Sequence, residues 1–403
     1  MLPQNSGNWR NFAALTPKKA ILKAGREGSV LRGHPWIFSG AIQQADPCEV
    51  GDWVEVYAKN GDYLGAGHAG NGSIAIRLLT HVSEKPDAAF WKDRLQNCRA
   101  LRQRLGLGFD RPTNAYRLVH GEGDRLPGLI IDMYNTCAVI QAHSHGMYFA
   151  LQEISTALQE VMGNRLSTIY SKSRSALHEE QATDGWLLGD ETGTIAMENG
   201  VPFHVNWESG QKTGFFLDQR ENRQLLMHYA AGREVLNTFC YTGGFSVFAL
   251  KGGATRVHSV DISEKAVALA AENVALNGLE SWHSVQAADV MEYLKEPEQL
   301  WDIAVLDPPA FAKNLSKKHQ AVMGYKRLNT LGLKAVKPGG LLFTFSCSQV
   351  IDDVLFANTV TAAGIEAGRQ VRILHRLSQG PDHPVNLYHP EGHYLKGLVL
   401  EVE

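Results

Sequence analysis

The stretch Ile303-Ala304-Val305-Leu306-Asp307-Pro308-Pro309 joins a short apolar run to a carboxylate and two prolines. A second apolar run, residues 341–345, ends at Ser346-Cys347-Ser348. Short apolar runs predict buried strands, and ligands of open α/β sheets bind at the carboxyl ends of such strands. We therefore expect Asp307 and Cys347 to lie at one edge of a parallel sheet. A thiol beside a carboxylate predicts covalent chemistry on a planar, electron-poor ring.

Strand-like and helix-like segments alternate regularly around these two runs from residue 207 onward. The predicted strands are residues 234–239, 256–262, 283–287, 303–307, 340–347, 371–377 and 395–402, and the predicted helices are residues 245–251, 263–277, 290–294, 320–336 and 352–367. Ser263 is the expected N-cap of the second helix. Strands that alternate with helices predict βαβ units. We therefore expect an α/β fold in which residues 207–403 form a Rossmann-like domain with a seven-stranded, mostly parallel sheet.

Two smaller domains are expected before this one, behind a flexible N-terminal tail at residues 1–17. Residues 18–84 contain strand-like segments at 19–22, 36–38, 52–57, 63–68 and 74–79, with a hairpin signal at Asn60-Gly61, which predicts a β-barrel. Residues 85–206 combine predicted helices at 88–105 and 148–162 with predicted strands at 116–120, 129–133, 137–143, 166–170, 194–198 and 201–206. That mixture predicts a central α+β domain with a largely antiparallel sheet.

The composition is typical of a soluble globular protein. Hydrophobic residues make up 44% of the 403 positions and charged residues 20%, so the chain can fill two or three separate cores. No apolar stretch approaches the ~18 residues that span a bilayer. Residues 1–17 lack the apolar core of a signal peptide, so a cytoplasmic location is expected.

Cysteine and histidine patterns argue against a metal site. The five cysteines are an odd number without a C-x-x-C pair, which also argues against a disulfide framework. Four histidines near the C-terminus have spacings that do not match those of metal ligands. These are His375, His383, His389 and His393. We expect them to lie in a solvated loop on the substrate side, and no metal is predicted.

Positive charge is concentrated in two places, although the net charge is only −3. Residues 1–36 and residues 312–337 each hold a basic cluster. The first consists of Arg10, Lys18, Lys19, Lys23, Arg26 and Arg32, and the second of Lys313, Lys317, Lys318, Lys326, Arg327, Lys334 and Lys337. Either could be the solvated face of a helix. Two clusters, one of them just after Asp307-Pro308-Pro309, favour contact with a polyanion.

A glycine loop follows the first strand of the C-terminal domain, in residues 239–246. Gly243 and Gly244 lie between that strand and a helix, where the absence of Cβ lets the backbone approach a ligand. Asp261 ends the second strand and could bind ribose hydroxyls or be an incidental loop residue. Asp289 follows the third strand and could bind an adenine amino group or cap the next helix. Glycine loop, two acids and Asp-Pro-Pro in this order are the layout of class I S-adenosylmethionine enzymes, so S-adenosylmethionine is the expected cofactor.

The reactive residues also have plain structural interpretations. Cys347 could be a small buried hydrophobe, but its place beyond the apolar run, between two serines, favours a nucleophile. Pro308 and Pro309 fix a rigid turn that holds Phe311 over the pocket, where its ring could stack on a target base or wedge the loop. Cys240 and the three cysteines of the other domains are interpreted as structural.

Longer motifs carry a likeness to a known family. They are Lys23-Ala24-Gly25-Arg26-Glu27 and Gly33-His34-Pro35-Trp36-Ile37-Phe38-Ser39-Gly40 in the first domain, Asp124-Arg125-Leu126-Pro127-Gly128-Leu129 in the second, and Gly210-Gln211-Lys212-Thr213-Gly214-Phe215-Phe216-Leu217-Asp218-Gln219-Arg220 before the glycine loop. Over nearly its whole length after residue 17, the chain resembles the RlmI-type bacterial methyltransferases, which form 5-methylcytosine in large-subunit ribosomal RNA. The resemblance implies a PUA domain that binds RNA at 18–84, a central α+β domain at 85–206, and a methyltransferase domain at 207–403.

Roles follow for individual residues of this chain. Cofactor contacts are expected from Lys212, Thr213, Phe215, Asp218, Thr238, Phe239, Gly243, Gly244, Ser246, Asp261, Ile262, Asp289 and Asp307. RNA contacts are expected from Lys23, Arg26, Pro308, Pro309, Phe311, Lys313, Lys317, Lys318 and Arg327. Asp307 and Cys347 match the two catalytic positions of the family. Many cytosine-methylating enzymes have a second cysteine where this chain has Pro308-Pro309, so product release must run differently here.

The chemistry expected from these roles is covalent. Addition of the Cys347 thiolate at carbon 6 of cytosine makes carbon 5 an enamine carbon that can attack a sulfonium methyl group. Asp307 would hydrogen-bond the N3/N4 edge of a single-stranded or flipped base. The alternatives are methylation of a base nitrogen by Asp307-Pro308-Pro309 without a thiol, or a non-catalytic RNA-binding assembly factor. The exposed sheet of the middle domain could also support a homodimer.

Overall fold

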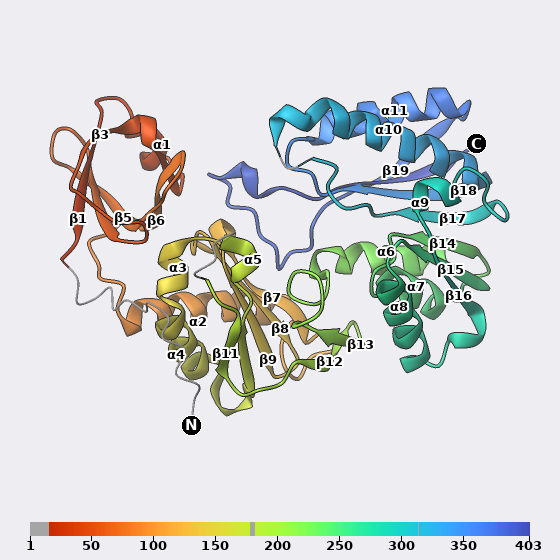
Figure 1. Ribbon diagram of the computed structural model, residues 1–403, viewed down its shortest axis with the longest axis horizontal. Coiled ribbons are helices and arrows are strands. Elements are labelled where there is room, and N and C mark those ends of the chain that lie inside the picture. The colour runs from red at the N-terminus through yellow and green to blue at the C-terminus, as the bar shows by residue number, and fades with distance from the viewer. Residues whose placement is uncertain (1–15, 178–181, 313) are drawn as a thin grey trace. The chain divides into compact units, whose positions relative to one another are not determined.

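The computed structural model describes residues 16–177, 182–312 and 314–403. The chain divides into two compact units, which Figure 1 traces from the N-terminus to the C-terminus. Unit 1 contains the residues up to 200 together with 205–215 and 381–392, and unit 2 contains 201–204, 216–380 and 393–403. Most of the expected tail, residues 1–15, lies outside the described residues. Among the described helices, none is long and apolar enough to cross a membrane.

The first part of unit 1 is a six-stranded sheet with the order β2-β6-β5-β4-β1-β3. Its elements are β1 (Lys18–Leu22), α1 (Gly28–Leu31), β2 (Trp36–Phe38), β3 (Ile42–Ala45), β4 (Trp53–Tyr57), β5 (Tyr63–Ala69) and β6 (Ile74–Thr80). Alternate residues of β1, Ala20 and Leu22, are fully buried, which is the period-two pattern of a strand with one buried face. The five predicted strands are confirmed to within one residue. The two four-residue elements α1 and β3 were not predicted.

The second part of unit 1 is a five-stranded sheet with the order β11-β10-β9-β8-β7. Its elements are α2 (Ala88–Arg104), β7 (Ala115–His120), β8 (Leu129–Tyr134), β9 (Cys137–Ala142), α3 (His145–Phe149), α4 (Leu151–Met162), β10 (Thr168–Ser171), α5 (Arg174–Leu177) and β11 (Gly185–Leu188), followed by the hairpin β12 (Gly193–Glu198) and β13 (Val201–Asn206). Three of the four pairings in the five-stranded sheet are antiparallel, as predicted. The helix predicted at 148–162 is two helices that meet at Ala150, and β11 was not predicted.

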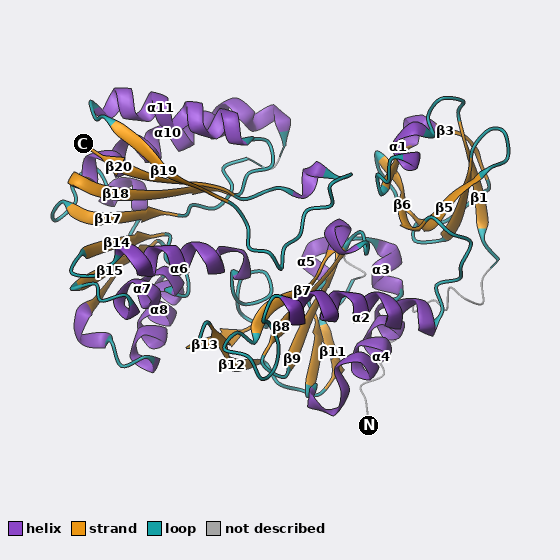
Figure 2. Ribbon diagram, turned by 180° about the vertical axis from the view of Figure 1, so that it is seen from behind, coloured by secondary structure: helices purple, strands orange, loops and turns teal. Residues whose placement is uncertain are grey.

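Unit 2 is built on a seven-stranded sheet with the order β16-β15-β14-β17-β18-β20-β19. Its elements are α6 (Arg220–Tyr229), β14 (Glu234–Thr238), α7 (Gly244–Lys251), β15 (Arg256–Asp261), α8 (Glu264–Leu276), β16 (His283–Ala287), α9 (Val290–Tyr293), β17 (Trp301–Leu306), α10 (Lys318–Ala335), β18 (Val336–Ser346), α11 (Asp353–Ala367), β19 (Val371–Leu377) and β20 (Lys396–Val402). Four pairings are parallel and the two made by β20 are antiparallel, so the mostly parallel sheet is confirmed. Figure 2 shows α10 and α11 on one face of the sheet and α6, α7 and α8 on the other.

Local sequence explains most of these elements. Residues 303–306 of β17 are all fully buried, as expected for a central parallel strand covered on both faces. Ser263 is the N-cap of α8, as predicted, and its hydroxyl oxygen accepts a hydrogen bond from the Ala266 N–H at 3.3 Å. By contrast, α6 was not predicted, because three of its ten residues are charged and several polar ones, such as Asn222 and Arg223, are buried.

The segment 381–392 connects β19 to β20 and packs within unit 1. Asp382 is fully buried there, and its carboxylate accepts a hydrogen bond from the Arg117 N–H at 3.0 Å. His383 and His389 are only 2% and 3% exposed. The prediction of a solvated histidine loop is therefore wrong for these two residues, because the segment carries buried polar contacts to parts of the chain far away in sequence.

Arg102 on α2 gives a test of this packing. Its guanidinium is fully buried, donates to both carboxylate oxygens of Asp124 at 2.6 and 2.7 Å, and donates to the Asp382 carbonyl at 2.7 Å. Arg102→Met removes the ion-pair partner of the buried Asp124 carboxylate, so we expect a loss of about 3–5 kcal/mol in the free energy of unfolding. Denaturant unfolding measures this, with Arg104→Met, at an exposed position of the same helix, as the control. Equal stability of the two variants would contradict the structure.

Candidate active site

The two predicted catalytic residues lie at the same edge of the seven-stranded sheet. β17 and β18 pair in parallel with Leu306 opposite Thr344, and Asp307 and Cys347 follow the ends of these strands. The Ser348 hydroxyl donates to the Ala312 carbonyl at 2.6 Å, which ties the loop after β18 to the loop after β17. The thiol and the carboxylate are thus delivered to one place by adjacent strands.

Asp307 is oriented by a pair of buried amides. The Gln219 side-chain N–H donates to Asp307 Oδ1 at 3.0 Å. Asn222, on α6, donates in turn to Gln219 Oε1 at 2.6 Å, which fixes the orientation of the Gln219 amide. Asp307 itself is half-buried. Gln219 lies in a motif that carries the family likeness, but sequence analysis did not select it as a site residue.

Lys396 is a second residue that sequence analysis missed. It lies on β20 opposite Ser346, is 2% exposed, and donates to the carbonyls of Ser348 at 2.8 Å and Tyr394 at 2.6 Å. Burial lowers the pKa of Lys396, and the sulfur of Cys347 opposes that shift. The ammonium therefore lies within electrostatic reach of Cys347, where a positive charge favours the thiolate over the thiol.

Tyr325 on α10 lies close to both catalytic candidates. Burial raises the pKa of Tyr325 to about 12, and the charges of Cys347 and Asp307 act in the same direction. Its hydroxyl therefore stays protonated at neutral pH. The ring of Phe311 packs on Tyr325 with a centroid distance of 4.6 Å and over Gly324, where an added Cβ would lie 3.0 Å from it. This packing favours the interpretation of Phe311 as a wedge for the loop, and base stacking stays untested.

The glycine loop has an unusual backbone conformation. Phe239, Tyr241 and Gly243 have φ values of +54°, +43° and +73°, which are costly for residues other than glycine. A Cβ on Gly243 would lie 2.9 Å from the Cβ of Ala270 on α8, so no side chain fits there. The Tyr241 N–H donates to Asp261 Oδ2 at 3.1 Å, which holds the loop against the end of β15. A strained loop held in this way is a feature of ligand-binding sites.

The two acids of the predicted cofactor site differ in their surroundings. Asp261 is half-buried and is followed by Ile262, whose side chain is 72% exposed. A carboxylate beside an exposed apolar side chain suits a nucleoside, which has sugar hydroxyls and an apolar base face. Asp289 caps α9 and accepts hydrogen bonds from the N–H groups of Met291 at 2.8 Å and Glu292 at 3.1 Å. The helix-cap interpretation of Asp289 is confirmed, and its contact with adenine stays a prediction.

Several predicted cofactor residues are buried in hydrogen-bond networks. Thr238 donates to the Val305 carbonyl at 2.7 Å, and the Ser246 hydroxyl lies 2.6 Å from that of Ser259. These hydrogen bonds stabilise the strand and the helix that flank the glycine loop. Gly244 approaches Arg223 of α6 so closely that an added Cβ would lie 2.9 Å from the arginine side chain.

The motif that precedes α6 is divided between the two units. Thr213 and Phe215 are buried within unit 1, where the Thr213 hydroxyl donates to Asp132 Oδ2 at 2.6 Å. Lys212 has a φ of +48°. Asp218 is buried in unit 2 and accepts a hydrogen bond from the Tyr394 hydroxyl at 2.7 Å. Contact of these four residues with a cofactor remains a prediction.

The predicted RNA-contact residues differ in exposure. Those that are exposed are Lys23, Arg26, Pro309, Lys317 and Arg327. Lys318 and Phe311 are half-buried, Pro308 is buried, and Lys313 lies outside the described residues. Lys317 immediately precedes α10, Lys318 is its first residue, and Arg327 lies near the middle of the helix. All three follow the Asp-Pro-Pro turn along the chain.

Comparison with known proteins gives a consistent result. Residues 117–391 match a family described as S-adenosylmethionine-dependent methyltransferase, and residues 20–81 match a PUA-like domain. The chain is similar to the "Ribosomal RNA large subunit methyltransferase I" of Alteromonas mediterranea, with 40% identity that covers 95% of this chain and 98% of the relative. The protein of the same name from Aeromonas hydrophila is 41% identical, and the match covers 94% of this chain and 98% of the relative.

Two solved structures are similar over almost the whole chain. One is a putative S-adenosylmethionine-dependent methyltransferase from Streptococcus mutans, with 25% identity and a TM-score of 0.82, covering 95% of this chain and 99% of that one. The other is a putative methyltransferase complexed with SAH, with 25% identity, a TM-score of 0.83 and the same coverage.

The position of Lys396 beside Cys347 can be tested without a substrate. Lys396→Gln keeps an N–H donor for the neighbouring carbonyls but removes the positive charge, so we expect the thiolate of Cys347 to form only at higher pH. The readout is the pH midpoint of iodoacetamide alkylation at Cys347, followed by peptide mass spectrometry. The exposed Lys334→Gln serves as the control. An unchanged midpoint in Lys396→Gln would show that the ammonium does not act on the sulfur.

Proposed function

This chain belongs to the S-adenosylmethionine-dependent methyltransferase family and carries a PUA-like domain, and from that membership we propose that it methylates carbon 5 of a cytosine in large-subunit ribosomal RNA. The predicted cofactor, S-adenosylmethionine, is confirmed by the family, as are the class I methyltransferase fold and the PUA-like domain. The choice of carbon 5, the covalent step and the RNA substrate are parts of the proposal. A ribosomal RNA substrate would also place the reaction in the cytoplasm.

The observation that carries the proposal is the arrangement of Asp307 and Cys347. They follow paired parallel strands, and the Ser348–Ala312 hydrogen bond joins their loops. Methylation of a base nitrogen requires no thiol, because a nitrogen lone pair can attack a methyl group directly. Carbon 5 of cytosine has no such lone pair and requires activation. A cysteine at the carboxyl edge of β18, beside a buried ammonium, supplies the nucleophile for that activation.

The residues around the glycine loop fit the cofactor. The absence of a Cβ at Gly243 and Gly244 lets the loop pack against Ala270 and Arg223, while Asp261 and Ile262 suit the ribose and the base of an adenosine. S-adenosylmethionine, when bound, supplies an electrophilic methyl group. The strained backbone of the loop is held by Asp261, so the same carboxylate would shape the loop and bind the nucleoside.

The proposed mechanism assigns a task to each residue of the β17–β18 edge. The Cys347 thiolate adds to carbon 6 of the cytosine, and carbon 5 becomes nucleophilic. Asp307, oriented by Gln219, accepts or shares a hydrogen bond at the N3/N4 edge and offsets charge that develops on the ring. Once carbon 5 carries the methyl group, a water molecule would take the carbon-5 proton, and the electron pair of that C–H bond would reform the C5–C6 double bond and expel the Cys347 thiolate. Lys396 acts as a positioning residue: its positive charge favours the Cys347 thiolate before the attack on carbon 6 and again when the thiolate is released.

Exposed basic residues support a nucleic-acid substrate. Lys317 and Arg327 lie on the chain that follows the Asp-Pro-Pro turn, and Lys23 and Arg26 lie in the PUA-like domain. Each can neutralise a backbone phosphate without reading sequence. The target cytosine must leave its base stack to reach the edge of the sheet, so a single-stranded or flipped base is the proposed substrate.

A covalent-trapping experiment tests the choice of carbon 5. Ribosomal RNA that contains 5-fluorocytosine cannot lose a proton from carbon 5, so the wild-type protein should form a stable adduct with it. Cys347→Ala should form no adduct and should lose methyl transfer by at least ~10⁴-fold, since the nucleophile is absent. Cys48→Ala, which removes an exposed cysteine of the PUA-like domain, should behave like the wild type. Methyl transfer by Cys347→Ala at the wild-type rate would favour methylation of a base nitrogen.

Calorimetry with S-adenosylmethionine tests the cofactor site separately. Asp261→Ala removes a charged hydrogen-bond acceptor, so the dissociation constant should rise roughly 10- to 100-fold. Asp261→Asn keeps an acceptor and should lose less, while Glu272→Ala, at an exposed position on α8, should leave the affinity unchanged. If the wild type did not bind the cofactor, a non-catalytic role in RNA binding or assembly would be favoured instead.

A further inference from the structure

Three side chains that can bind a metal ion converge in unit 1. His34 lies between α1 and β2, and His389 and Glu391 lie in the segment 381–392. One ligand atom from each of the three lies within 4.8 Å of the others. His34 Nε2 is 3.8 Å from Glu391 Oε1, and His389 Nε2 is 3.8 Å from Glu391 Oε2. The three side chains therefore surround one small space.

The hydrogen bonding of both histidines leaves ring nitrogens available for that space. Nδ1 of His34 accepts a hydrogen bond from the Trp36 N–H at 3.1 Å, so Nε2 is the nitrogen that faces Glu391. His389 is 3% exposed, and neither of its ring nitrogens hydrogen-bonds to another residue in the described part of the chain. A buried imidazole without a partner costs free energy, and such groups in native proteins usually bind an ordered water or an ion.

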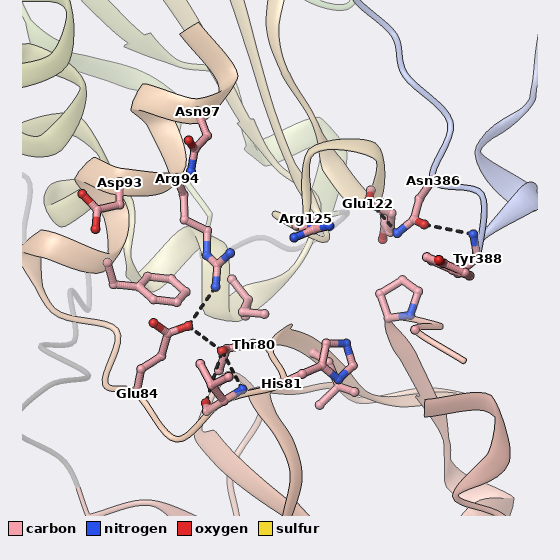
Figure 3. Close-up of a pocket in the computed structure, with 16 residues that line it drawn as sticks. Thr80, His81, Glu84, Asp93, Arg94, Asn97, Glu122, Arg125, Asn386 and Tyr388 are labelled. Atoms are coloured by element: carbon pink, nitrogen blue, oxygen red, sulfur yellow. Dashed lines mark hydrogen bonds and ion pairs between the residues drawn. The ribbon is translucent and has the colours of Figure 1, made fainter. Parts of the chain in front are cut away.

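The surroundings hold the ring of His389 in place. It packs against Trp36 with a centroid distance of 4.3 Å, and the Trp36 indole N–H donates to Glu122 Oε1 at 2.9 Å. Asn386 donates to the Glu122 carbonyl at 3.3 Å and accepts from the Tyr388 N–H at 3.0 Å, as Figure 3 shows. The side chain of His389 is therefore positioned before any ligand arrives.

We propose that His34, His389 and Glu391 bind a divalent transition-metal ion of the zinc type. Two imidazole nitrogens and one carboxylate oxygen form a ligand set that suits zinc and is too rich in nitrogen for magnesium or calcium. Ligand atoms on one tetrahedral zinc ion lie about 3.4 Å apart, so the distances of 3.8 Å require only a small side-chain adjustment. Glu391 is half exposed, and a water molecule can complete the coordination from that side.

Access to the proposed site is open. A cavity of about 500 Å³ is lined by Gly33 and Tyr388, the immediate chain neighbours of His34 and His389, and by Glu122 and Asn386 from the network that positions the ring. The Glu391 side chain is itself 52% exposed, so an ion can reach its carboxylate directly from solvent.

The consequence of binding is a crosslink within unit 1. His34 belongs to the PUA-like domain, whereas His389 and Glu391 belong to the segment that connects β19 to β20. The other end of that segment is already fixed, since Asp382 binds Arg102 and Arg117. The ion would fix the second end and stabilise the folded chain by an amount that grows with the logarithm of its concentration relative to its dissociation constant.

Zinc titration of the full-length protein tests the proposal. Protein stripped of metal with a chelator is titrated with ZnCl2 in competition with a chromophoric chelator. We expect one equivalent to bind tightly to the wild type. His389→Gln and Glu391→Gln should each raise the zinc dissociation constant of this site by at least ~100-fold. Circular dichroism checks that the variants are folded. If His389→Gln fails to fold, Glu391→Gln still tests the site, because the Glu391 side chain is half exposed.

His228→Gln, which removes an exposed histidine on α6, is the matched control and should bind zinc as the wild type does. In a thermal melt, zinc should raise the midpoint of the wild type and of His228→Gln, but not that of Glu391→Gln. Absence of binding by the wild type, or equal binding by all four proteins, would overturn the proposal and indicate adventitious binding only. Because these readouts do not involve methyl transfer, they are independent of the proposed function.

Discussion

The parallel pairing of β17 with β18 is the constraint on which the candidate active site depends. Leu306 lies opposite Thr344, so one strand delivers a carboxylate and the other a thiol to the same edge of the sheet. A slip of this register by one residue would turn the side chains to the opposite face of the sheet. Residues 303–306 are fully buried, so such a slip would require the side chains on both faces of β17 to repack. Beyond the paired strands, the hydrogen bond from Ser348 to Ala312 joins the loop after β18 to the loop after β17.

The parts of the fold and site that could be predicted have signals within one short stretch of sequence. Asp307 and Cys347 each follow an apolar run, and Gly243 lies between a strand and a helix, so their places at the sheet edge follow from pattern alone. Lys396 and Gln219 could not be found in this way. The Lys396 contact with Ser348 spans 48 residues, and the Gln219 contact with Asp307 spans 88. No local periodicity records such contacts, which exist only once the sheet has formed.

The histidines near the C-terminus also show that local sequence patterns do not reveal contacts between distant residues. The usual metal-ligand spacings apply to ligands that lie close together in sequence, and the spacings of these histidines do not indicate a metal site. His389 instead meets His34, which precedes it by most of the length of the chain. The expectation of a solvated loop also failed for His383 and His389, because the segment is tied down at Asp382. The Asp382 carboxylate accepts a hydrogen bond from the Arg117 N–H, and its carbonyl accepts one from the buried Arg102 side chain. Composition suggests exposure for such a polar segment, but buried partners from elsewhere in the chain reverse that outcome.

Lys396 also bears on the absence of a second cysteine from the Asp-Pro-Pro turn. On the proposed mechanism, Cys347 must leave carbon 6 at the end of the reaction, and a thiolate leaves faster when its charge is stabilised. An ammonium buried beside the sulfur provides that stabilisation, although its own burial lowers the pKa of Lys396. Two backbone carbonyls accept its hydrogen bonds and offset the cost of removing it from water. A fixed positive charge would thus aid release at a site where Pro308 and Pro309 stand in place of a second cysteine.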